Sequence, residues 1–172
     1  MGEIKSTLDI IMEKAQDFTV TEEEKKAFQK KEVEVKVRGF LQKYLDGLME
    51  IESFKQEMGA FGGNQQEMAR EALKRECLDR IDPEADNARL LKLLDHLDDK
   101  NTLHLLEILS EFQKDLEKER AVREKAVRER LRRAGVSGKA VIPNIEGDLE
   151  WIRYKSERRE SFYEKLDLIK NK

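Results

Sequence analysis

The chain has 172 residues, the usual size of one domain. Charged residues make up 41% of it, but 34 basic side chains nearly balance 37 acidic ones and the net charge is only −3. This balance argues against a global attraction to nucleic acid or to anionic membranes. The low apolar content of 38% leaves little surface that folding could bury.

The composition predicts helices throughout. Ala, Glu, Lys, Leu and Arg account for 90 of the 172 residues, above the roughly 50% typical of coiled coils and long helices. Unbranched side chains lose little rotamer freedom in a helix, and two prolines and nine glycines offer few interruptions. We therefore predict an all-α fold, an elongated helical bundle or antiparallel coiled-coil-like hairpins with two long helices. A single helical domain is expected over residues 1–172.

Apolar spacing and turn residues divide the chain into segments. Helices are predicted at about 4–18, 22–58, 65–81, 83–97, 102–134 and 148–169, with an irregular segment at 135–147.

The second helix carries the clearest local signals. Thr21 and Glu24 form a capping-box pattern at its start. The alternation of Val33, Val35 and Val37 with charged residues would also suit a strand. We favour a helix there because the four-three apolar spacing continues past Gly39. Gly59 to Gly63 end this helix, either as a hinge or as a fixed turn.

Two later segments stand out. Asp82 before Pro83 predicts the cap of the fourth helix, and the leucine-rich stretch at 88–116 predicts the core. Beyond it, acidic residues precede basic ones by four positions, the orientation that best supports an exposed helix. These pairs are Glu119 with Arg123, Glu124 with Arg128, and Glu129 with Arg133. Residues 118–133 therefore predict a solvated helical arm.

Few residues suggest catalytic or metal chemistry. His96 and His104 lie near several carboxylates, which makes a metal-dependent enzyme a minor alternative. The single cysteine, Cys77, has no histidine near it in sequence, and we expect it to be structural rather than nucleophilic. Gly138-Lys139 lacks the other residues of a phosphate-binding loop. We predict no enzyme activity, no catalytic residues, no metal ligands and no cofactor.

The expected location is the cytoplasm. Cys77 cannot form an internal disulfide, the first residues lack the apolar core of a secretory signal, and no apolar run approaches the ~20 residues that span a bilayer. Met1-Gly2 formally begins a myristoylation pattern, but the pattern is short and common. We expect no membrane contact.

The leading functional hypothesis is a non-enzymatic protein-interaction protein, an adaptor, scaffold or chaperone-like helical protein. Its apolar seams are longer than a compact domain of this size needs, so a protein partner or a second copy would cover them. A homodimer is the simplest assembly, and no small-molecule substrate is evident. The predicted protein-binding residues are Val37, Phe40, Tyr44, Leu48 and Ile51, with Val141 and Ile142 as a secondary strip. The alternative is a nucleic-acid-associated protein that uses the basic arm at 118–133.

Overall fold

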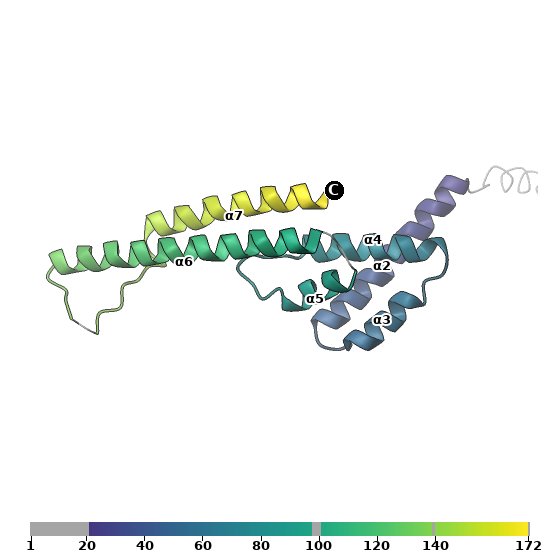
Figure 1. Ribbon diagram of the computed structural model, residues 1–172, viewed down its shortest axis with the longest axis horizontal. Helices are drawn as coiled ribbons and strands as arrows, with labels where there is room; N and C mark the ends of the chain where they lie inside the picture. The colour runs from purple at the N-terminus through teal and green to yellow at the C-terminus, as the bar shows by residue number, and fades with distance from the viewer. Residues whose placement is uncertain (1–20, 98–100, 139, 172) are drawn as a thin grey trace, which may run out of the picture. The chain divides into compact units, whose positions relative to one another are not determined.

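The fold is all-α, as the composition predicted. The computed structural model describes residues 21–97, 101–138 and 140–171, and no strand occurs in these ranges. The helix predicted at 4–18 lies outside them. The helices in chain order are α2 (Glu22–Leu45), α3 (Ile51–Gly59), α4 (Asn64–Asp79), α5 (Ala88–His96), α6 (Asn101–Arg133) and α7 (Leu149–Lys170) (Figure 1). The bounds of α4, α6 and α7 lie within two residues of the predicted ones.

The chain divides into two compact units, residues 1–73 and 74–172, and the division falls inside α4. Each unit has its own buried side chains. The single-domain organisation stays a prediction. Among the described residues, no helix is long and apolar enough to cross a bilayer.

In the first unit, aromatic contacts join α2 to α3 and to the segment that follows α3. The ring centroids of Tyr44 and Phe54 lie 5.6 Å apart, and those of Phe40 and Phe61 lie 6.4 Å apart. The capping box at Thr21 and Glu24 is present, and residues 33–37 are helical, so both local predictions are confirmed. The buried apolar side chains are Val33, Val37, Leu41, Tyr44, Phe54, Phe61, Ala69, Ala72 and Leu73.

The single helix predicted over 22–58 is wrong, because the chain breaks between α2 and α3. The amide of Leu48 donates to the carbonyl of Lys43 at 2.8 Å, and the amide of Gly47 donates to that of Tyr44 at 3.1 Å. Gly47 has a positive φ of 75°. These two bonds with a left-handed glycine form a Schellman motif, which satisfies the last carbonyls of α2 and ends it.

The helix predicted over 83–97 begins later, at Ala88. The side-chain amide of Asn87 donates to the carbonyls of Asp82 at 2.7 Å and Ala85 at 3.1 Å. These bonds close residues 82–87 into a turn. Asp82 accepts from the amide of Glu84 at 3.0 Å, so it caps this turn rather than a helix.

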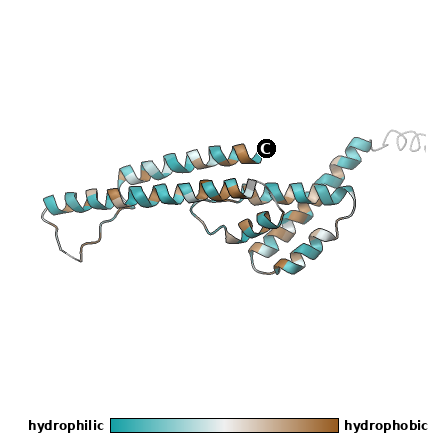
Figure 2. Cartoon of the chain, viewed as in Figure 1, coloured by the Kyte–Doolittle hydropathy of each residue, from teal (hydrophilic) through white to brown (hydrophobic). Residues whose placement is uncertain are grey.

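The core of the second unit lies along α6 and α7. Figure 2 shows that α6 is banded with hydrophobic residues near its start and becomes mostly hydrophilic toward its end. The change agrees with the predicted passage from core to arm. The buried apolar side chains of this unit are Cys77, Leu78, Ile81, Leu90, Leu93, Leu94, Leu105, Ile108, Leu109, Phe112, Ile145, Trp151, Phe162, Leu166 and Ile169.

The break after α2 generates a paired prediction. Gly47→Ala should lower the free energy of unfolding by about 1 kcal/mol, because alanine is strained at a positive φ. Gly39→Ala should raise it by about 1 kcal/mol, because Gly39 lies inside α2 and an added methyl group meets no atom of the described chain within 4 Å. Urea denaturation of both variants checks the opposite signs. A change of the same sign in the free energy of unfolding of both variants would contradict a helix end at Gly47.

Burial of Cys77 predicts a pH effect. Burial raises the pKa of its thiol from 9.0 to about 12, so the thiol ionises in the unfolded chain before it ionises in the folded one. Its contribution to stability is therefore complete below pH 9 and declines as the pH rises from there toward 12. Urea denaturation should show that the free energy of unfolding of the wild type exceeds that of Cys77→Ala by less at about pH 10 than at about pH 8. An unchanged advantage would contradict the prediction.

Candidate protein-binding surface

The second unit is built on a pair of antiparallel helices. α6 and α7 lie side by side (Figure 1), and the rings of Phe112 and Phe162 meet edge to face with centroids 5.7 Å apart. Residues late in α6 pair with residues early in α7, as in the ion pair between Arg130 and Asp148. We call this arrangement the α6–α7 pair.

Ion pairs flank the apolar seam of the α6–α7 pair. Lys165 donates to Glu111 at 2.6 Å, and Arg158 lies 3.4 Å from Asp115. The hydrogen bond from Lys165 lowers the pKa of the Glu111 carboxyl below its ordinary value. In both pairs α6 supplies the acid and α7 supplies the base.

Asp148 lies at the junction of α7 and the preceding segment and forms contacts that fix this junction in place. Its side chain is buried and accepts a hydrogen bond from the amide of Trp151 at 3.1 Å, which makes it the N-cap of α7. It also pairs with Arg130 of α6. The hydrogen bond from Arg130 lowers the pKa of the Asp148 carboxyl. One carboxylate therefore joins both helices across the intervening segment.

The segment before α7 presents one apolar side chain to solvent. Pro143 and Ile145 are buried, whereas Val141 is half-buried and Ile142 is 89% exposed. Because its neighbours are packed and Asp148 is anchored, Ile142 projects from a segment held at its C-terminal side. A large apolar side chain held in this way suits contact with another protein.

A groove of about 590 Å³ lies at the distal end of the α6–α7 pair, and we call it the distal groove. Its apolar lining comes from Val127 and Leu131 of α6 and from Leu149 of α7, which is 81% exposed. Asn144 and Gly147 of the segment that carries Ile142 line it as well. The groove thus joins apolar surface from both helices and from the loop.

A second groove of about 460 Å³ lies beside Trp151, with Phe112 and Leu116 in its lining. Charged side chains surround this apolar lining. Lys155 donates to Glu146 at 2.8 Å, and this bond lowers the pKa of the Glu146 carboxyl. The lining of this groove therefore combines apolar side chains with charged ones.

The strip predicted on the second helix is largely covered by the chain itself. Val37 and Tyr44 are buried in the first unit, Phe40 and Ile51 are half-buried, and Leu48 is 79% exposed in the break after α2. These residues therefore do not form one continuous exposed face. Their role in binding a partner stays a prediction, whereas Leu149, which that prediction missed, is exposed beside the distal groove.

The residues considered for other chemistry lie apart. Among the described residues, no group of three His, Cys, Asp or Glu side chains could hold a metal ion. His104 lies 3.4 Å from Glu107 on the surface of α6, and His96 is exposed on α5. Cys77 is buried. The raised pKa of its thiol disfavours the thiolate that a nucleophile requires.

The three ion pairs predicted along the helical arm are present. Arg123 lies 2.5 Å from Glu119, Arg128 lies 2.9 Å from Glu124, and Arg133 lies 3.2 Å from Glu129. Each stabilises an exposed helix modestly, by about 0.2–0.5 kcal/mol.

Comparison with known proteins adds no relative: no protein-family model matches the sequence, and neither curated proteins nor solved structures show a significant match.

The two roles of Asp148 can be separated by substitution. Asp148→Asn keeps a side chain that can cap α7 but removes the charge, whereas Asp148→Ala removes both. We expect stability at neutral pH to fall in the order wild type, Asp148→Asn, Asp148→Ala, measured by urea denaturation. The charge contribution is present above the ordinary pKa of 3.8 and is lost as the pH falls below it, because the folded pKa is lowered. If the difference in the free energy of unfolding between wild type and Asp148→Asn persisted well below that pH, the ion pair would not be the cause of the difference.

Proposed function

We propose that this chain is a non-enzymatic protein-interaction protein, and that its contact surface is the distal groove together with Ile142. The observation that carries the proposal is the exposure of Ile142 and Leu149, two large apolar side chains on either side of the Asp148 anchor. Folding leaves both side chains in water although the chain has few apolar residues to spare. Covering them with a protein surface would remove that cost.

The partner that we propose for this surface is a second copy of the chain. A two-fold dimer uses the same patch on both copies, so a single apolar surface is sufficient for assembly. Within each copy, we further propose that the α6–α7 pair packs in the manner of an antiparallel coiled coil. We place the protein in the cytoplasm, where a reducing environment suits its free and buried Cys77.

The proposal predicts that apolar contact survives high salt. In sedimentation velocity at about 0.5 M NaCl, where charge contacts are screened, the wild-type chain should form a dimer as its concentration rises. The double variant Ile142→Glu with Leu149→Glu should remain a monomer, because burying a carboxylate at the contact is unfavourable. Circular dichroism should show unchanged helicity, since both side chains are exposed.

Leu168→Glu is the matched control. Leu168 is also an apolar residue of α7 and is 66% exposed, but it lies at the opposite end of the helix. This variant should dimerise like the wild type. A compact wild-type monomer at high protein concentration would exclude the proposed dimer, and a dimer that survives the double substitution would exclude this contact surface.

A further inference from the structure

The outer side of α6 carries a line of basic residues, and the exposed acids Glu117 and Glu129 lie beside this line. The positions on this side are 114, 118, 121, 125, 128 and 132, which follow a four-three spacing. All six are exposed, and all but Ala121 are basic. Arg128 pairs with Glu124, and the other four basic side chains form no ion pair within the described part of the chain. We call this set the α6 basic stripe: Lys114, Lys118, Lys125, Arg128 and Arg132.

The outer side of α7 carries the opposite charge. The positions on this side are 150, 153, 157, 160, 164 and 167. All six are exposed and follow the same alternation of three and four residues. Its one basic member, Arg153, pairs with Glu157 at 2.9 Å. We call the acidic set the α7 acidic stripe: Glu150, Glu157, Glu160, Glu164 and Asp167.

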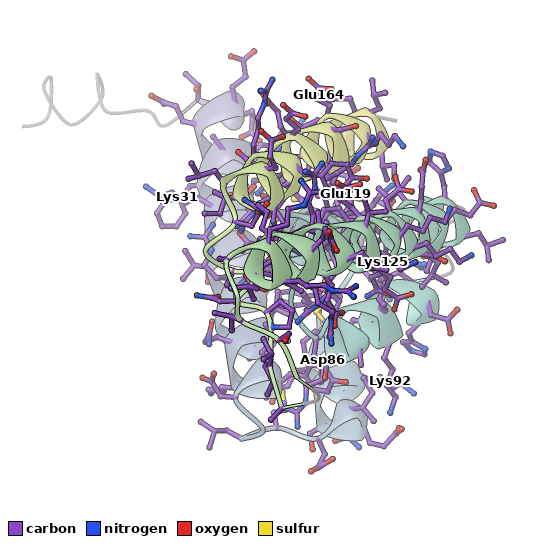
Figure 3. The ribbon with its side chains drawn as sticks, turned by 90° about the vertical axis from the view of Figure 1, so that its left-hand side faces the viewer. Lys31, Asp86, Lys92, Glu119, Lys125 and Glu164 are labelled. Atoms are coloured by element: carbon purple, nitrogen blue, oxygen red, sulfur yellow. The ribbon has the colours of Figure 1, made fainter. Side chains whose placement is uncertain are left out.

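The two stripes face away from each other. Lys114 follows the seam residue Phe112 by two positions, and Glu164 follows its partner Phe162 by two positions. Two residues correspond to about 200° around a helix, so both charged side chains point away from the seam. Figure 3, viewed along the α6–α7 pair, shows Glu164 on the outer side of α7 and Lys125 on the side of α6 away from α7.

At the seam the two helices carry the reverse signs. The acids Glu111 and Asp115 of α6 lie against the bases Lys165 and Arg158 of α7. The two helices therefore place acid from α6 and base from α7 at their shared edge. Their outer sides carry the opposite signs.

We propose that α6–α7 pairs of successive copies stack, with the α6 basic stripe of one copy on the α7 acidic stripe of the next. The stripes match in length, about 27 Å for the basic and about 26 Å for the acidic at 1.5 Å per residue. They also share the four-three spacing, so acidic and basic side chains can meet along most of the contact, with Ala121 and Arg153 as the exceptions. Because the two stripes lie on opposite sides, one copy contacts two others, and stacking continues instead of closing at a dimer.

A second copy fits the basic stripe better than nucleic acid does. A phosphate backbone would meet a chain with a net charge of −3 and a strongly acidic second side. A second copy instead supplies an acidic surface of matching length at equal concentration. The stacking deepens the proposed self-association and shares only Glu150 with the lining of the distal groove, so each contact can fail without the other.

The test uses the full chain with Ile142→Glu and Leu149→Glu as background, so that stacking is measured without the apolar contact. This chain should form assemblies larger than a dimer at about 20 mM salt and dissociate at about 0.5 M, where the Debye length is only a few ångströms. Lys118→Glu with Lys125→Glu should weaken association about tenfold or more, since like charges then face each other. Glu160→Lys with Glu164→Lys should do the same.

Restoration separates stacking from general charge effects. An equimolar mixture of the two reversed variants should assemble although neither does alone, and a chain carrying all four reversals should assemble by itself. Lys30→Glu with Lys31→Glu is the matched control, because it changes the net charge equally at exposed positions of α2. This control should associate like the background chain.

Three results would overturn the stacking. The first is a background chain that stays monomeric at low salt, and the second is reversed variants that are not restored by mixing or combination. The third is a low-salt gel shift of duplex DNA that Lys118→Glu with Lys125→Glu abolishes, in a chain that does not self-associate. That last result would assign the basic stripe to nucleic acid.

Discussion

The apolar seam between α6 and α7, centred on Phe112 and Phe162, is the interaction on which the second unit depends. Truncating a buried aromatic residue of this kind costs about 3–5 kcal/mol, far more than any surface ion pair on these helices contributes. The seam also sets the rotation of both helices about their axes. It thereby determines which side chains line the distal groove, which ion pairs form at the edges, and which charges point outward.

Much of the helical architecture could be predicted because helix composition and four-three spacing are local properties. The limits of α6 and α7 followed from the spacing of the apolar residues within each helix and from the turn residues around it. The Thr21 capping box was recognisable as a short motif. The break after α2 was missed because the seam residues continue in register through Gly47. A glycine inside a helical pattern signals a break only when its positive φ is known.

Which apolar side chains stay exposed was harder to predict than the fold. Periodicity identifies a face that will be packed, but it does not say whether the same chain supplies the packing, and Val37 and Tyr44 are covered from within. Spacing predicted the ion pairs along residues 119–133, but it did not show which charges these pairs leave over. Glu119 and Arg123 pair on the seam side of α6, whereas Lys118 and Lys125 are exposed on another side.

The separation of charge across the α6–α7 pair gives this part of the molecule a transverse electric dipole. Seen from several Debye lengths, a chain with a net charge of −3 is nearly neutral and exerts little force on its surroundings. At close range, the sign of that force depends on which side is presented. Encounters would then be selected by orientation rather than by overall attraction. A nearby charged surface would orient the α6–α7 pair before any side chain makes contact.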